Sequence, residues 1–140
     1  MKIVLDTNII LIALPTRSPY RIIFDSLLAG NFDLFLSTSI LYEYTEIIEN
    51  KTNPNIASNF AELLLGLKNV KFAEPFYHWN LIQKDKDDNK FVDLALAAQV
   101  DYLVTNDKHF NILKDIDFPK LNTIGLEDFS NLLKKEKSGN

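Results

Sequence analysis

Short apolar runs alternate along the chain with longer segments in which apolar residues recur every three or four positions. The short runs are rich in Val, Ile, Leu and Phe, a composition typical of strands buried on both faces of a parallel sheet. The longer segments have the one-sided spacing of amphipathic helices. We predict strands at residues 2–5, 34–36, 70–73, 102–105 and 122–124.

The helices predicted between these strands begin and end at residues that favour such positions. Ser37 to Ser39 form a cluster of good N-cap residues, Pro54 suits a first helical position, and Gly30 suits a helix end. We predict helices at residues 9–14, 20–29, 40–50, 54–67, 91–100, 108–113 and 126–133. The pattern predicts one α/β domain over residues 1–133, with a mainly parallel sheet, and a frayed polar tail at 134–140.

Composition narrows the classes of protein to consider. The chain has 140 residues, no cysteine and a net charge of −4. Disulfides and cysteine-based zinc sites are excluded, and no apolar run approaches the ~18 residues that a membrane helix needs. These features, with no signal-peptide pattern at the start, favour a cytoplasmic protein. Four glycines and no glycine-rich loop argue against a nucleotide-binding P-loop or a dinucleotide site.

Two aspartates follow the ends of predicted strands. Asp6 comes directly after Leu5, and Asp107 comes two residues after Thr105, the last residue of its strand. Functional clefts of open parallel sheets lie beyond the carboxyl ends of the strands, so both side chains are expected at one edge. The alternative is structural, because aspartate also caps helices and turns.

Glu43 is separated from two nearby glutamates by helical phase. The apolar face of its helix centres near residues 40, 44 and 47, and Glu43 lies on the flank of that face. Glu46 and Glu49 are expected to point toward water. The alternative for Glu43 is a border residue with its charge in solvent.

Asp93 lies inside the apolar segment from Phe91 to Ala98. A helix that is apolar on nearly every side is buried, and a buried unpaired carboxylate costs several kcal/mol. Asp93 therefore needs a cation, with a salt bridge to Lys90 as the structural alternative. Asp88 is interpreted as the N-cap of this helix, although it could also reach the cleft. We interpret His78 and His109 as structural, because neither has a partner at metal-ligand spacing.

Oxygen ligands without cysteine or paired histidine suit Mg²⁺ or Mn²⁺ rather than zinc. Such ions polarise phosphoryl oxygens and activate water, which fits phosphodiester hydrolysis. They would also explain how an acidic protein binds a polyanion, which is usually the work of a basic surface. Lysines flank the acidic motifs and could contact phosphates or simply face solvent; they are Lys84, Lys86, Lys90 and Lys108.

At these motifs the chain resembles PIN-domain ribonucleases, particularly the VapC-like toxins of bacterial toxin–antitoxin systems. The resemblance runs from Met1 to about Leu133 and rests on four motifs: residues 4–8, 39–43, 85–98 and 103–107. It implies a three-layer α/β/α fold and a Mg²⁺- or Mn²⁺-dependent endonuclease, usually acting on RNA. It implies metal ligation and catalysis by Asp6, Glu43, Asp93 and Asp107, with Asn8 and Thr105 in supporting positions. It also implies a possible antitoxin partner and a possible homodimer. Whether Asp88 or Asn106 takes part stays open.

Other functions compete with this interpretation. A phosphoacceptor signalling domain would need an acceptor aspartate at the end of a central strand, and the second and third strands end near Ser37 and Ala73 instead. A haloacid-type phosphatase would need an aspartate at position 8, which is Asn8. A catalytically silent PIN-like binding module is disfavoured because all four acids are present.

Overall fold

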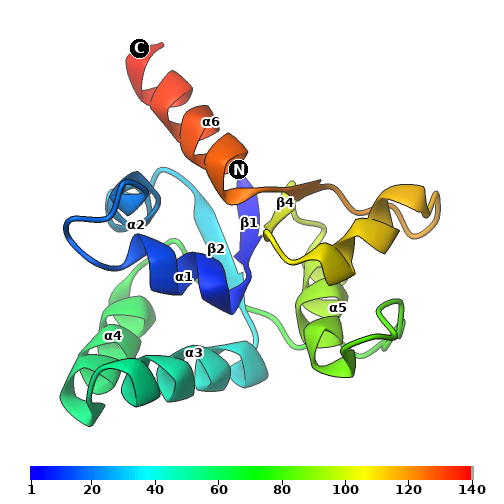
Figure 1. The fold of residues 1–140 in the computed structure, drawn as a ribbon, viewed down its shortest axis with the longest axis horizontal. Helices are drawn as coiled ribbons and strands as arrows, with labels where there is room; N and C mark the ends of the chain where they lie inside the picture. The colour runs from blue at the N-terminus through cyan, green and yellow to red at the C-terminus, as the bar shows by residue number, and fades with distance from the viewer. Residues whose placement is uncertain (140) are drawn as a thin grey trace.

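The computed structural model describes residues 1–139 as an α/β fold around one five-stranded sheet (Figure 1). The sheet order is β3-β2-β1-β4-β5, and every neighbouring pair of strands is parallel. The strands are β1 (Lys2–Leu5), β2 (Asp33–Leu36), β3 (Val70–Phe72), β4 (Tyr102–Val104) and β5 (Thr123–Ile124). The predicted fold class is confirmed.

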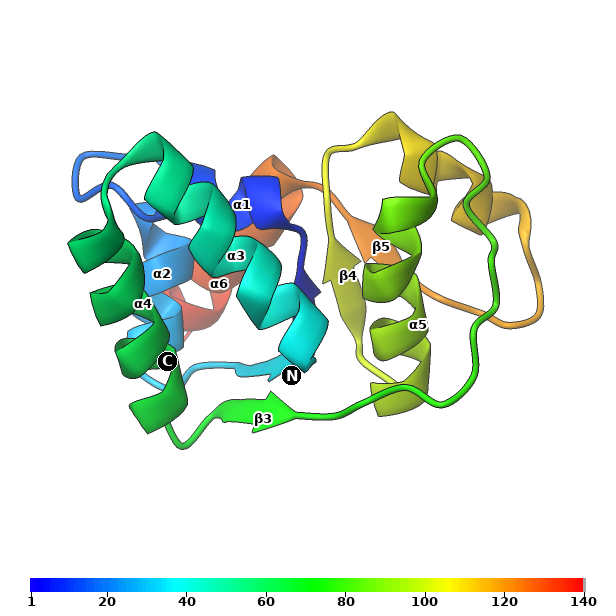
Figure 2. The ribbon, with the colours of Figure 1, turned by 90° about the horizontal axis from the view of Figure 1, so that it is seen from below.

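Helices cover the sheet on both sides. They are α1 (Thr7–Ala13), α2 (Arg21–Leu28), α3 (Thr38–Lys51), α4 (Pro54–Gly66), α5 (Asn89–Ala98) and α6 (Leu126–Ser138), with 3₁₀ helices η1 (Lys86–Asp88) and η2 (Lys108–Asp115). Helix α5 packs against β1, β2 and β4. In Figure 2 it lies to the right of β4, whereas the other α-helices lie to the left of β4. This is the expected three-layer arrangement.

The central strands explain the uninterrupted apolar runs in the sequence. Ile3, Val4 and Leu5 of β1 are fully buried, as expected for the central strand of a sheet between two layers of helices. In β4, Leu103 and Val104 are fully buried as well. The polar residues that follow β1 and β4 therefore lie at the carboxyl ends of two buried strands.

The predicted frayed tail at 134–140 is wrong for most of its length, because α6 continues to Ser138. Phe129 and Leu133 are buried and anchor the helix. Residues 134–138 are polar and exposed, and they continue the helix to Ser138. Lys135 and Lys137 in the last turn favour this end of the helix dipole. Asn140 lies outside the described residues. No helix within residues 1–139 is long and apolar enough to cross a membrane.

The charged segment at residues 84–90 is more ordered than the loop predicted there. Lys86–Asp88 form η1, and α5 begins at Asn89. The buried amide of Asn89 accepts a hydrogen bond from Ile82 N at 2.9 Å and donates one to Ile82 O at 2.8 Å. This paired contact fixes the preceding loop to the start of α5 and so sets the position of the acids in η1.

Candidate active site

Asp6 lies where β1 and β4 end side by side. Leu5 pairs with Val104 in the sheet, and the backbone N–H of Asp6 donates to Val104 O at 3.0 Å. The Thr105 hydroxyl donates to Asp6 Oδ2 at 2.8 Å. Asp6 occupies the N-cap position of α1, yet its side chain makes no capping hydrogen bond. Its carboxylate is therefore held by the residue that follows β4 and is not used to cap the helix.

Asp107 is tied to the same corner through Thr105. The backbone N–H of Asp107 donates to Thr105 Oγ1 at 3.0 Å, so one hydroxyl connects both aspartates. Asp107 also caps η2, since its Oδ1 accepts from His109 N at 2.9 Å. The structural role considered as an alternative is thus present, but the carboxylate still lies at the strand edge. Burial is the main cause that raises the pKa of Asp6, and the charges of Asp107 and Glu43 raise it further.

Glu43 reaches this corner from α3. Ser37 caps the helix by accepting from Ile40 N at 3.2 Å, and the buried Tyr44 hydroxyl donates to the carbonyl of Leu5. The Tyr44 contact joins α3 to the last residue of β1. Its neighbour Glu43 then accepts a hydrogen bond from the Thr7 hydroxyl at the start of α1. Glu43 is therefore oriented by a side chain adjacent to Asp6.

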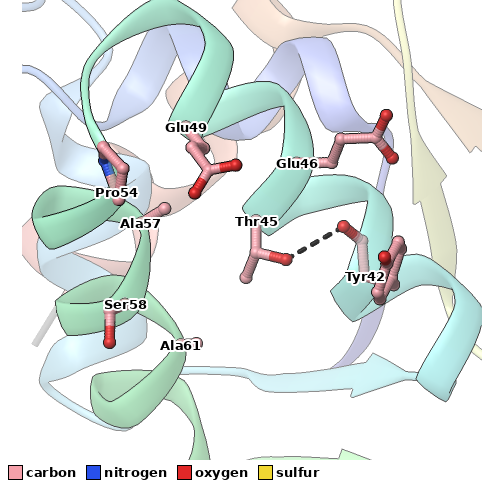
Figure 3. A pocket seen from close by; sticks show the side chains of 8 residues that line it. All are labelled: Tyr42, Thr45, Glu46, Glu49, Pro54, Ala57, Ser58 and Ala61. Atoms are coloured by element: carbon pink, nitrogen blue, oxygen red, sulfur yellow. Dashed lines mark hydrogen bonds between the residues drawn. The ribbon is translucent and has the colours of Figure 1, made fainter.

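The predicted helical phase of α3 is confirmed by burial. Glu43 is partly buried, whereas Glu46 and Glu49 are exposed. Figure 3 shows Glu46 and Glu49 beside a separate pocket of about 380 Å³ between α3 and α4. The residues lining that pocket do not include Asp6, Glu43 or Asp107. Only the first of the three glutamates thus belongs to the strand-end corner.

Lys90 joins α5 to α3 through Glu43. Its ammonium contacts Glu43 Oε1 and lies 3.0 Å from Asp87 Oδ1. Burial alone would lower the pKa of Lys90, but the contacts with these two carboxylates raise it. Lys90 thus neutralises part of the acidic group and is not a free phosphate contact. It also does not pair with Asp93, the partner considered from sequence.

Asp88 belongs to the group, and it stands at the helix start where the sequence predicted it. It occupies the N-cap position of α5 but makes no capping hydrogen bond with its side chain, which is 14% exposed. Its Oδ2 lies 3.3 Å from His109 Nδ1, and that nitrogen lies 3.5 Å from Asp107 Oδ1. Burial raises the pKa of Asp88 to about 6, and the nearby charges of Asp85, Asp107 and Asp6 add to the effect.

Asp93 has different partners from the other predicted acids. It is buried as predicted, at 3% exposure. Its Oδ1 accepts from Trp79 N at 3.0 Å, and its Oδ2 lies 3.2 Å from His78 Nδ1. It lines a pocket with Tyr77, Trp79 and Phe118, not the pocket that Asp6 lines. The loop before α5 therefore supplies the partner that the buried carboxylate requires.

An open pocket of about 470 Å³ lies beside Asp6 and Asp107. Asn8 is exposed on its lining, as a supporting residue would need to be. Lys51 lines it as well and could contact an anionic ligand. Asn106 also lines this pocket, but its Oδ1 accepts from Leu126 N at 2.8 Å and connects β4 to α6. We therefore assign Asn106 a structural role.

Sequence analysis missed several residues of this site, among them Thr7, Lys51 and His109. Thr7 follows Asp6 directly, and a hydroxyl beside a candidate acid was a usable signal. His109 was set aside for want of a partner at ligand spacing, although it lies two residues from Asp107. Its partners Asp85 and Asp88 come from a segment more than twenty residues earlier in the chain. Only folding brings them together.

The donor chemistry of this corner fits a hard divalent cation. Asp6, Glu43, Asp88 and Asp107 offer carboxylate oxygens, the ligands that Mg²⁺ and Mn²⁺ prefer. Burial and repulsion from neighbouring acids raise the pKa of both Asp6 and Asp88, so Lys90 compensates only part of the negative charge of the ionised group. A bound cation would supply that charge.

The raised pKa of Asp88 predicts a pH effect on the metal-free protein. With a pKa near 3.8 when unfolded and about 6 when folded, Asp88 binds more proton in the folded state between these values. Its contribution to stability is present at low pH and is lost as pH rises through about 6. In a chelator, Asp88→Asn should therefore melt higher than the parent protein at pH 7.5, with the difference shrinking by pH 5. A difference in melting temperature that does not change with pH would contradict this assignment.

Comparisons with known proteins agree with the fold. A family model described as the PIN domain matches residues 2–109. A solved structure of VapBC2 from Rickettsia felis, bound to a DNA fragment from their promoter, contains a chain 20% identical to this one. The match has a TM-score of 0.62 and covers 89% of this chain and 98% of that one. No curated protein matches the sequence.

A second solved structure is VapBC-1 from nontypeable Haemophilus influenzae. Its matching chain is 23% identical, with a TM-score of 0.62, and the match covers 91% of this chain and 99% of that one. At these identities the two solved structures show only that the fold is shared. The match to the family model shows the family to which the chain belongs. The chain belongs to the PIN-domain family.

Proposed function

We propose that this protein is a metal-dependent endoribonuclease that hydrolyses RNA phosphodiester bonds, and that it is the VapC-like toxin of a toxin–antitoxin pair. The observation that carries the proposal is the convergence of acids at one sheet edge. Asp6, Glu43, Asp88 and Asp107 come from four separate segments. Burial first, and then the charges of neighbouring acids, raise the pKa of Asp6 and of Asp88. Acids held close together repel one another and lower the stability of the fold, and such groups with shifted pKa values are found preferentially at functional sites.

Mg²⁺ or Mn²⁺ would be held by these four carboxylates and would supply Lewis-acid stabilisation of phosphoryl charge and activation of water. Thr105 orients Asp6, and Thr7 orients Glu43, so the two most constrained acids keep fixed positions. Lys90 reduces repulsion around Glu43. We do not carry Asp93 into this set, because its carboxylate is engaged with Trp79 and His78.

The pocket beside Asp6 is the proposed place for the RNA backbone. Asn8 and Lys51 line it and could hydrogen-bond a phosphate. The protein has a net charge of −4, so cations rather than a basic surface must offset much of the repulsion from RNA. Weak binding of RNA without divalent ions is the consequence.

The proposed partner is an antitoxin protein. Both matching solved structures are VapBC assemblies, one of them with promoter DNA. By analogy we propose that a cognate antitoxin covers the acidic corner and that this chain forms a homodimer. An RNA substrate would place its action in the cytoplasm.

The structure argues against a phosphoacceptor function for a different reason than the sequence does. The central strand of the sheet is β1, which ends just before Asp6, and not β2 or β3, which end just before Ser37 and Ala73. Asp6 is nevertheless only 6% exposed. The lysine that contacts this acidic group, Lys90, pairs with Glu43 and Asp87 rather than with Asp6. A buried acceptor without a lysine partner fits transfer of a phosphoryl group poorly.

Cleavage of RNA by the purified chain tests the proposal. Single-stranded and structured RNAs should be cut with Mn²⁺ or Mg²⁺ and should stay intact with chelator. A matched preparation of Glu43→Gln serves as the control for contaminating nuclease, and Glu46→Gln on the same helix should retain activity. Binding of RNA without metal-dependent cleavage would indicate a silent PIN-like binding module. Labelling of Asp6 by a small phosphodonor would indicate the phosphoacceptor function.

A further inference from the structure

We infer that His109 supplies an imidazole nitrogen to the metal centre and makes that centre favour Mn²⁺ over Mg²⁺. The inference rests on the proposed function, because it assumes that the acidic corner holds a divalent ion. The proposal adds His109, which sequence spacing does not single out, to the metal ligands. It also predicts a preference between Mg²⁺ and Mn²⁺, which four carboxylates alone would not give.

Three side chains form a compact set of donors beside Asp107. Asp85, Asp88 and His109 each offer one ligand atom, and these atoms lie within 4.8 Å of one another. His109 Nδ1 lies 3.3 Å from Asp88 Oδ2 and 3.5 Å from Asp107 Oδ1. The nitrogen therefore faces two acids that belong to different segments of the chain, one preceding α5 and one following β4.

Local structure holds His109 in this position. Its backbone N–H donates to Asp107 Oδ1 at 2.9 Å, which fixes the first turn of η2. The opposing Asp85 accepts from Asp87 N at 3.1 Å and caps η1. The His109 side chain is 37% exposed, so an ion can reach it from solvent. The donors are thus arranged by backbone contacts before any ion binds.

The chemistry of the donors predicts the choice of ion. Mg²⁺ prefers oxygen ligands and gives up its water reluctantly. Imidazole is a ligand for first-row transition ions, among which Mn²⁺ binds it least tightly, whereas carboxylates serve both Mg²⁺ and Mn²⁺. A mixed set of carboxylates and one imidazole therefore raises affinity for Mn²⁺ more than affinity for Mg²⁺. Lys90 does not occupy this place, because its ammonium is engaged with Glu43 and Asp87.

The chain contains its own comparison in His78. It is the other of the two histidines, and its Nδ1 lies 3.2 Å from Asp93 Oδ2. That contact resembles the His109–Asp88 contact but lies outside the three-residue set of donors. If His109 were only an ion-pair partner, replacing either histidine would have the same small effect on metal binding.

Pulsed electron paramagnetic resonance on Mn²⁺ added to the metal-free, full-length protein tests the inference directly. The spectrum should show coupling to a directly bound ¹⁴N in the parent protein and in His78→Asn, and this coupling should vanish in His109→Asn. Labelling His78→Asn with ¹⁵N-histidine should convert the pattern to ¹⁵N. Circular dichroism and melting in chelator establish that each variant folds.

Affinities supply a second readout that does not depend on RNA cleavage. In His109→Asn the Kd for Mn²⁺ should rise by about tenfold, the scale expected for a residue that tunes a metal site, while the Kd for Mg²⁺ changes less than about threefold. Unchanged nitrogen coupling in His109→Asn, or equal losses for the two ions, would overturn the inference. Failure of the parent protein to bind either ion would instead overturn the proposed function. Mn²⁺ binding without nitrogen coupling would overturn the inference about His109 alone.

Discussion

Replacing Asp6 by asparagine should reduce metal-dependent RNA cleavage by about 100-fold or more, which corresponds to a loss of about 2.7 kcal/mol of transition-state stabilisation. Asp6 is the acid most completely enclosed by the site, and Thr105 holds it in one orientation. Asparagine keeps the shape and the acceptor for Thr105 but removes the charge that binds a cation. The rate of cleavage under single-turnover conditions measures the effect.

The same substitution should stabilise the metal-free protein while removing its response to metal. Burial and the charges of Asp107 and Glu43 disfavour ionised Asp6, so its neutral replacement should raise the melting temperature of the metal-free protein. In the parent protein, Mn²⁺ at about 100 times its Kd should add about 2.7 kcal/mol to stability. That increment should largely disappear in Asp6→Asn.

Asp25→Asn is a suitable control for this pair of effects. Asp25 is an exposed residue on α2 that pairs with Arg21 at 3.0 Å, and surface pairs of this kind contribute little. It should leave cleavage and the metal response unchanged. An Asp6→Asn variant that cleaves RNA normally would exclude Asp6 from the site.

Asp88→Asn and Asp93→Ala should have opposite effects, although the sequence pattern assigns the more important role to Asp93. Asp88→Asn should lower RNA cleavage by about 10- to 100-fold, because Asp88 lies with Asp6, Asp107 and His109. Asp93→Ala should retain the metal response. It should lose about 1–3 kcal/mol of stability instead, because it leaves the backbone N–H of Trp79 without its acceptor.

Melting temperature with and without Mn²⁺, measured beside single-turnover cleavage, separates the two roles. The expected pattern is a lost metal response with an intact fold for Asp88→Asn, and a weakened fold with an intact metal response for Asp93→Ala. If Asp93→Asn, which keeps an acceptor for Trp79, also lost the metal response, Asp93 would have to be returned to the metal site.

The amino-acid sequence by itself determined the fold class and part of the acidic corner. Fully apolar runs such as Ile3 to Leu5 can be satisfied only by burial on both faces, so they predict a parallel sheet and the points where its strands end. Asp6 and Thr105 follow from those end points. Helical phase separated Glu43 from Glu46, because the apolar face of α3 has a single direction.

Tertiary structure decided which acids meet. Residues 88 and 93 are separated by five positions, or about 140° around a helix, so the two side chains of this segment point in different directions. Because α5 is apolar on nearly every side, its sequence does not show which of its sides faces the edge of the sheet. The loop that carries His78 and Trp79 packs against α5, and both residues contact the Asp93 carboxylate. Helix η2 places His109 beside Asp88.

The strand order was also set by tertiary structure. It places β1 at the centre of the sheet, next to β4, so that Asp6 and Thr105 become neighbours although 99 positions separate them. These are long-range contacts, and their partners are chosen by the packing of the whole chain and not by any local pattern of residues.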